Sequence, residues 1–233
     1  MTKDELLERY ETLGDERDFE AARALYERAL AETVDARLLN DYGYLLECHG
    51  RRALRRAVEL YERAIDVGAA YDKPHYQLIS ARAALGDAEH SVADYERRLA
   101  RSRDEVREYR FLGWACVMAR DFTRAFAVAD AGLAVATRDA QLLAVRGEAK
   151  AGLRDVDGAL ADWREAAELD PDDIGPLYSS AFLLERAGRL AEAAAAWRSI
   201  IAWNESRGDA LQTEWPRQEL ERLLARRQDA SNA

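Results

Sequence analysis

Residues 156–171 read VDGALADWREAAELDP, and their apolar side chains follow a helical pattern. Leu160, Trp163 and Ala167 lie three and four places apart, so they share one face of an α-helix. A helix of this length is marginal in water and must pack against other helices. Runs of alternating β-branched and polar residues, which are typical of strands, are nearly absent from the 233-residue chain. The sequence therefore predicts an all-α protein.

The pattern recurs with a period close to 34 residues, which indicates a repeat protein. Six segments align with one another, and they end in YERAL, YERAI, YERRL, VADAGL, WREAA and WRSII. Their bulky position is occupied by Tyr26, Tyr61, Tyr95, Ala129, Trp163 and Trp197. The intervals between these residues are 35, 34, 34, 34 and 34. Four residues earlier, every segment has a small residue, namely Ala22, Ala57, Ser91, Ala125, Ala159 and Ala193. Three residues after the bulky position stand Ala29, Ala64, Arg98, Gly132, Ala166 and Ile200. Small residues leave holes that bulky side chains fill, so these columns predict contacts between stacked helices.

A second amphipathic helix is predicted upstream of each segment, with a small residue near its middle. These small residues are Gly43, Ser80 in a looser match, Gly113, Gly147 and Ala181. Glycine costs about 1 kcal/mol relative to alanine inside a helix, so its use there predicts close approach of the paired helices. Short turns are expected between the helices, and residues 51–56 are expected to form a basic turn that carries an insertion.

These columns resemble the tetratricopeptide repeat (TPR), a helix-turn-helix unit of 34 residues. In the best unit, the positions of that pattern are occupied by Leu143, Gly147, Val156, Ala159, Trp163, Ala166 and Pro171. The preceding unit matches it with Tyr109, Leu112, Gly113, Cys116, Phe122, Ala125 and Gly132. The resemblance implies a right-handed superhelical solenoid of about six repeats. Ala129 departs from the pattern at an aromatic position, where Phe126 is expected to fill the space.

The resemblance places a repeat array in residues 1–203, with units at about 3–36, 37–72, 73–105, 106–139, 140–173 and 174–203. After the array, Trp215 and Pro216 predict a break, because proline disfavours helix in the residue before it. Residues 204–227 are expected to form a linker and a capping helix that covers the apolar face of the last repeat. Residues 228–233 are expected to be a flexible tail.

The composition limits the partners and the compartment. A net charge of −10 opposes binding along a phosphate backbone, so nucleic acid is not expected as a partner. The apolar runs are shorter than the roughly 18 residues of a membrane helix, and the N-terminus does not have the pattern of a secretory signal. We therefore expect a cytoplasmic protein that does not bind a membrane. The 31 Arg against 3 Lys suggest a GC-rich bacterial genome.

The sequence contains no motif for catalysis or for a resident cofactor. Cys48 and Cys116, with three scattered histidines, are too few for a zinc site, and both thiols are expected to be reduced. Phosphate loops, dinucleotide-binding turns and nucleophile elbows are absent. Glu148 and Arg110 are the one candidate pair of converging titratable groups, and a salt bridge is expected between them. The sequence thus predicts a non-enzymatic protein without cofactor or metal.

The resemblance implies that the first helices of the repeats line an inner face where partners bind. The residues expected on this face are Arg37, Asn40, Tyr44, Lys73, Tyr76, Arg107, Arg110, Trp114, Glu148, Tyr178 and Phe182. Arg107, Arg110 and Trp114 are three and four places apart and share a helical face. Guanidinium groups bind carboxylates in bidentate fashion, and aromatic rings are frequent interface anchors. This favours a peptide with an acidic or C-terminal carboxylate segment; stacking of Arg110 on Trp114 is the alternative.

We therefore expect a protein-interaction scaffold that binds an extended peptide segment of another protein in its groove. The alternative is a structural protein that acts through self-association, for example as a homodimer. This alternative rests on Leu6, Leu7 and Leu13 of the first predicted helix, because no preceding repeat covers them.

Overall fold

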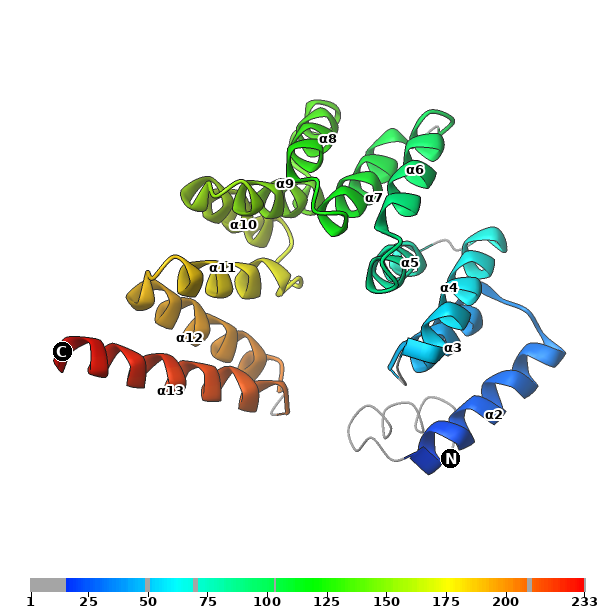
Figure 1. The fold of residues 1–233 in the computed structure, drawn as a ribbon, viewed down its shortest axis with the longest axis horizontal. Helices are drawn as coiled ribbons and strands as arrows, with labels where there is room; N and C mark the ends of the chain where they lie inside the picture. The colour runs from blue at the N-terminus through cyan, green and yellow to red at the C-terminus, as the bar shows by residue number, and fades with distance from the viewer. Residues whose placement is uncertain (1–15, 49–50, 69–70, 103, 209–210, 233) are drawn as a thin grey trace. The chain divides into compact units, whose positions relative to one another are not determined.

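The computed structural model describes residues 16–48, 51–68, 71–102, 104–208 and 211–232, and the regular secondary structure in these ranges is helical. The helices, drawn in Figure 1, are α2 (Glu16–Glu32), α3 (Ala36–Cys48), α4 (Arg51–Asp66), α5 (Lys73–Ala84), α6 (Ala88–Leu99), α7 (Glu105–Met118), α8 (Phe122–Val135), α9 (Ala140–Gly152), α10 (Val156–Leu169), α11 (Gly175–Arg186), α12 (Leu190–Ser206) and α13 (Leu211–Asn232). The predicted all-α fold is confirmed. Leu6, Leu7 and Leu13 lie outside the described residues.

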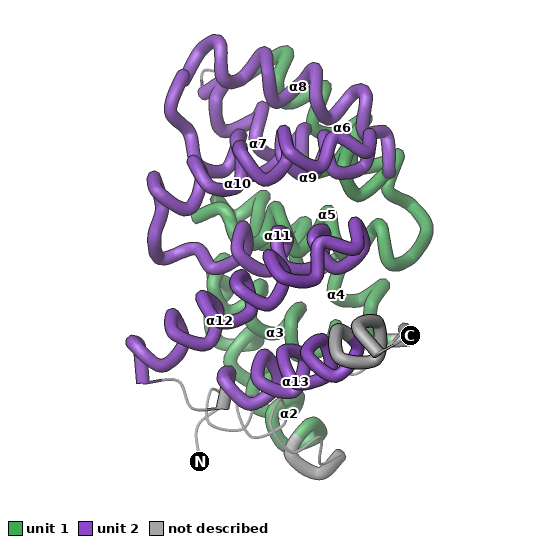
Figure 2. Tube along the Cα trace, turned by 90° about the vertical axis from the view of Figure 1, so that its left-hand side faces the viewer, with its two compact units in different colours: residues 1–101, 114–119 green, residues 102–113, 120–233 purple. Residues whose placement is uncertain are grey.

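The chain divides into two compact units, coloured separately in Figure 2. The first contains residues 1–101 and 114–119, and the second contains residues 102–113 and 120–233, so α7 contributes to both. In the first unit α2 to α6 pack consecutively, and in the second unit α8 to α13 do. The first helices of neighbouring pairs also touch, as α3 does with α5 and α9 with α11. Each unit is therefore a stack of consecutive helix pairs, as the repeats predicted.

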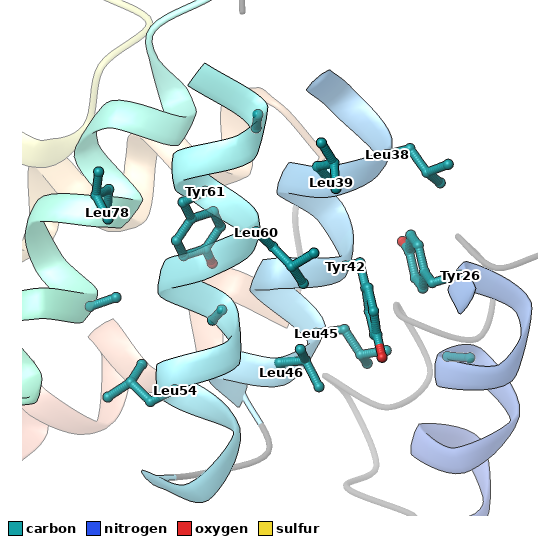
Figure 3. Close-up of a cluster of buried hydrophobic side chains, with 14 of the residues drawn as sticks. Tyr26, Leu38, Leu39, Tyr42, Leu45, Leu46, Leu54, Leu60, Tyr61 and Leu78 are labelled. Carbon is teal, nitrogen blue, oxygen red and sulfur yellow. The ribbon is translucent and has the colours of Figure 1, made fainter. Parts of the chain in front are cut away.

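The columns found in the sequence form the core of the two units. The bulky column is at most 2% exposed at Tyr26, Tyr61, Tyr95, Ala129, Trp163 and Trp197. The column four places earlier is 0% exposed at Ala22, Ala57, Ser91, Ala125, Ala159 and Ala193. Figure 3 shows Tyr26 and Tyr61 among the leucines of the cluster in the first unit. The repeated residues are thus core contacts.

Glycines in the first helices make room for the rings of the second helices. A Cβ atom added to Gly147 would lie 2.4 Å from Nε1 of Trp163, and one added to Gly43 would lie 2.6 Å from Cε1 of Tyr61. Neither distance admits another carbon atom, so each ring lies directly against helix backbone. The Trp163 Nε1 also donates a hydrogen bond to the backbone oxygen of Ala144 at 3.2 Å. Close approach of the paired helices, predicted from the glycines, is the observed geometry.

The repeat that has Ala129 at the aromatic position fills its space differently from the sequence expectation. A Cβ atom on Gly113 would lie 2.7 Å from Cγ1 of Val145, with Val128 next at 3.7 Å. Val145 belongs to α9, the first helix of the following pair. The neighbouring repeat, and not Phe126, therefore supplies the side chain nearest to this glycine.

Four turns between the two helices of a pair each contain a residue with a positive φ angle, and these residues are 34 positions apart. Gly86, Arg120, Arg154 and Gly188 have φ values of 84°, 62°, 69° and 72°. This left-handed region costs a residue with a Cβ atom roughly 1–2 kcal/mol. Arg120 and Arg154 adopt it where the equivalent turns have glycine, so the stack imposes this turn on them. Residues 51–56 do not form the expected turn, because α4 begins at Arg51.

Helix α13 continues through Trp215 and Pro216, where the sequence predicted a break. Proline lacks the N–H that would bond to the carbonyl of residue 212, one turn earlier. The Nδ2 of Asn204 on α12 donates to that Gln212 oxygen at 2.8 Å, and Asn204 is 2% exposed. A side chain thus replaces the missing backbone donor, so the helix is not interrupted. It extends to Asn232, through residues expected to form a tail.

Helix α13 packs one side against α12. Leu223 is fully buried, in one cluster with Trp197 and Ile200 of α12. Outward positions of α13, such as Arg217 and Arg222, are exposed. The last helix pair is therefore covered by a helix whose other side is polar, as a terminal cap requires.

We predict that Gly147→Ala destabilises the protein by about 1–3 kcal/mol, because the added methyl group overlaps the Trp163 ring. Alanine would otherwise favour the helix by about 1 kcal/mol. Urea unfolding followed by circular dichroism measures the change. Ala161→Gly, at an exposed position of α10, is the control for helix propensity alone. Greater stability of Gly147→Ala than of the wild type would contradict the close packing.

We also predict that Asn204→Ala destabilises the protein by about 1–3 kcal/mol, because the Gln212 carbonyl loses the donor that the buried Asn204 side chain supplies. In a Pro216→Ala background the restored N–H can bond to this carbonyl, so the same substitution should cost less. A double-mutant cycle in urea measures the difference between the two backgrounds. An equal cost in both would show that Asn204 does not compensate for the proline.

Candidate partner-binding faces

In the first unit, the predicted inner-face residues come from α3 and α5. Arg37 and Lys73 are exposed, and Tyr44 and Tyr76 are half-buried. The Nζ of Lys73 lies 5.5 Å from the centre of the Tyr44 ring, within range of a cation–π attraction. The two helices thus present two cations together with aromatic rings.

Two further predicted residues of the first unit are less accessible. Asn40 is 0% exposed, and its Nδ2 donates to Oδ1 of Asp41 at 3.3 Å. Trp114, on the part of α7 that belongs to this unit, is half-buried. A partner at the surface of the first unit therefore cannot contact the Asn40 side chain unless the core opens.

In the second unit, both arginines of α7 are half-buried. The Arg107 guanidinium lies 5.3 Å from the centre of the Phe111 ring. The Nε of Arg110 donates to both carboxylate oxygens of Asp139, at 3.1 and 3.0 Å, and its Nη2 also bonds to Oδ2. Oδ1 of Asp139 in turn accepts from the backbone N–H of Leu142 at 2.9 Å and so caps α9. Arg110 therefore holds the capping residue of the next helix pair.

This pairing changes the interpretation of Arg110. Asp139 is buried, with 8% of its side chain exposed, and the pair is bidentate, which is the strongest arrangement for a guanidinium and a carboxylate. The chain's own carboxylate thus takes the place that the sequence analysis assigned to a ligand. The expected salt bridge of Arg110 with Glu148 is replaced by this internal pair.

Glu148 is bonded to a hydroxyl group on the neighbouring first helix. Its Oε1 accepts from Oγ of Ser179 on α11 at 2.6 Å. Burial raises the pKa of the Glu148 carboxyl above its ordinary value, while the Ser179 bond and the charge of Arg186 act in the opposite direction. The carboxyl thus joins α9 to α11 at the inner face.

Four aromatic rings from α11, α12 and α13 pack together at the end of the second unit. Trp197 is fully buried, and the ring of Phe182 meets it edge-on with centroids 5.4 Å apart. Trp215 also meets Trp197 edge-on at 5.5 Å, and Tyr178 stacks on Trp215 at 5.8 Å. Phe182 and Trp215 are 43% and 44% exposed. We call the outer side of Tyr178, Phe182 and Trp215 the aromatic face.

The sequence analysis identified Tyr178 and Phe182 but missed Trp215. Trp215 precedes a proline, so it was interpreted as the site of a helix break. A signal was nevertheless present, since Trp215 follows Phe182 by 33 residues, close to one repeat period. Helix α13 therefore contributes Trp215 to the aromatic face in addition to packing on α12.

Arg110→Ala is predicted to destabilise the protein by about 3 kcal/mol, because it leaves the buried Asp139 carboxylate without its cation. Thermal and urea unfolding measure the loss. The exposed Arg37 provides the control, and Arg37→Ala should change stability by less than about 0.5 kcal/mol. Wild-type stability of Arg110→Ala would mean that its side chain is free for a ligand.

Two further features of the described ranges concern membranes and metal ions. None of their helices combines the length and hydropathy that crossing a bilayer requires. They contain no group of three or more His, Cys, Asp and Glu side chains placed to hold a metal ion. Cys116 is buried.

Comparison with known proteins identifies the fold. No protein-family model matches the sequence, and neither does any curated protein. A thermophilic TPR protein from Thermus thermophilus has a similar structure, with a TM-score of 0.62 and 22% identity over 82% of this chain and 99% of that one. A tetratricopeptide repeat protein from Parabacteroides merdae has a TM-score of 0.53 and 15% identity over 95% of this chain and 93% of its own. With helix pairs stacked in sequence and core columns 34 residues apart, the chain has the tetratricopeptide-repeat fold.

Proposed function

We propose that the chain is a non-enzymatic protein-interaction scaffold that binds an extended peptide segment of another protein on the inner faces of its repeats. The observation that carries the proposal is the aromatic face. Phe182 and Trp215 expose more than two fifths of their area, although aromatic side chains gain free energy when they are buried. A partner that covers them would recover this free energy.

The rigidity of the aromatic face supports its use in binding. Both exposed rings pack edge-on against the buried Trp197, and Trp197 is fixed by a hydrogen bond from its Nε1 to Oε1 of Glu185 at 2.7 Å. Rings held in this way lose little conformational freedom when a ligand arrives, so more of the contact free energy appears as affinity. Rigid aromatic anchors of this kind are frequent hot spots.

The first unit supports a preference for acidic segments. Arg37 and Lys73 are exposed on α3 and α5, and a guanidinium and an ammonium group both attract carboxylates. With Arg110 paired internally, we assign the recognition of an acidic or C-terminal carboxylate segment to these two cations. Glu148 receives no catalytic role in this proposal, because its carboxyl is held by Ser179.

A peptide selected from a phage-displayed library of random dodecamers tests the aromatic face. We expect Phe182→Ala and Trp215→Ala each to weaken binding of the selected peptide at least tenfold, or about 1.4 kcal/mol, in isothermal titration calorimetry. The matched control is Leu153→Ala, which removes a 49% exposed apolar side chain elsewhere in the same unit. Circular dichroism confirms that each variant is folded.

Unchanged affinity of both aromatic variants would contradict the proposal. Sedimentation velocity over a range of protein concentrations addresses the alternative of self-association. A dimer that dissociates on dilution and is lost in Phe182→Ala would show that a second copy, and not a foreign peptide, covers the aromatic face.

A further inference from the structure

A second surface of the second unit is an open trough between the second helices of its last two pairs. Its volume is about 800 Å³. Its floor comes from α11, at Leu177, Ser180 and Leu184. Its walls come from α10 and α12 and include Leu160, Ala161, Arg164, Ala167, Glu168 and Ala195. Leucines and small residues thus line most of the trough, and charges lie along its rim.

The preceding trough of the same unit is crossed by an arginine, and we call it the closed trough. It lies between α8 and α10 and has about 320 Å³. Arg146 rises from α9, and its Nη1 donates to Oδ1 of Asp130 on α8 at 3.2 Å. Its Nε and Nη2 donate to the two oxygens of Asp162 on α10, both at 2.9 Å. One side chain therefore ties both walls together across the floor.

The residues that close this trough are replaced one repeat later. Thirty-four residues after Arg146 stands Ser180, and 34 residues after Asp162 stands Ala196. The Oγ of Ser180 donates to the backbone oxygen of Pro176 in its own helix at 2.8 Å, so it does not cross the floor. The last trough has consequently lost the bridge and both of its hydrogen-bonded anchors on α10 and α12.

We infer that this open trough is a docking site for an amphipathic helix of a partner protein. The site is separate from the aromatic face. The side chains of Leu177, Ser180 and Leu184 point about 150° away from those of Tyr178 and Phe182 around α11, at 100° per residue. The inference therefore goes beyond the proposed function and does not depend on it.

The shape of the trough favours a helix as its occupant. Residues 157–168 of the α10 wall span about 16 Å, or three helical turns. Ala161 and Ala167 on one wall and Ala195 on the other have short side chains, which permit the axis-to-axis distances of about 8–10 Å found between packed helices. A helix with leucine-sized side chains at positions i, i+3, i+4 and i+7 would cover the leucine floor.

Charges on the rim define the flank of that helix. At one end, Arg189 is neutralised within the chain, because Nη1 bonds to Asp157 at 2.5 Å and Nε to Glu192 at 2.7 Å. Farther along α10, Arg164 and Glu168 are exposed and one turn apart. Arg164 occupies the position that is Asp130 in the closed trough, so the sign of the wall charge is reversed. The partner helix should therefore place a glutamate opposite Arg164 and a lysine opposite Glu168.

A synthetic helix tests the inference directly. The probe is an 18-residue, fluorescein-labelled peptide with such a leucine stripe, a glutamate and a lysine four places apart beside the stripe, and alanine elsewhere. Fluorescence anisotropy with the full chain should give saturable binding. The variant Ser180→Arg/Ala196→Asp copies two residues of the closed trough and should bind the probe at least tenfold more weakly. Ala161→Trp, which blocks the wall from an exposed position, should have the same effect and guards against misfolding of the double variant.

A charge exchange makes the test specific. A probe with lysine in place of its glutamate should bind the wild type more weakly and regain affinity for Arg164→Glu. Phe182→Ala should bind the original probe as the wild type does, so failure at the trough is distinguishable from failure at the aromatic face. Absence of saturable binding, or equal affinity for the wild type and both blocked variants, would overturn the inference.

Discussion

Contact between an aromatic ring on the second helix and glycine backbone on the first is the constraint on which the rest of the structure depends. At Gly147 and Trp163, and at Gly43 and Tyr61, the ring occupies space that a single Cβ atom would fill. This contact sets the spacing of the paired helices and directs the ring column into the core. The remaining sides of the first helices are then available at the surface. These contacts therefore help to place the residues that the sequence predicted for an inner face.

One pair of equivalent positions, the first on the first helix and the second on the second helix, alternates between an ion pair and apolar residues in neighbouring repeats. Nη1 of Arg82 bonds to Asp94 at 2.6 Å, and Nζ of Lys150, at the equivalent position two repeats later, lies 2.7 Å from Asp162. In the alternate repeats, the residues at these two positions are both apolar. They are Leu46 with Leu60, Cys116 with Val128, and Leu184 with Ala196. A buried ion pair exchanged as a whole for apolar residues can be nearly neutral, whereas loss of one partner is costly. The joint change of both positions is what this energetic rule requires.

The periodic part of the fold could be predicted from the sequence, because each core column recurs at a fixed interval. Tyr26 and Trp197 therefore needed no structure to be placed in the core. Contacts that occur once could not be predicted in this way. The bond from Asn204 to the Gln212 carbonyl joins two helices outside the repeat pattern. The pairing of Arg110 with Asp139 depends on the residue that caps α9. For the candidate site, Tyr178 and Phe182 followed from the repeat register, whereas Trp215 lies on the irregular cap.

The account holds that ring and glycine are matched in the helix pairs that contain both, and a double-mutant cycle of Gly147→Ala with Trp163→Leu tests this match most directly. Unfolding in urea gives the effect of the added methyl group with and without the ring. We expect the methyl group to destabilise the protein beside tryptophan and to be neutral or stabilising beside leucine, with a coupling energy above about 1 kcal/mol. Additive effects of the two substitutions would contradict direct packing of the ring on the glycine.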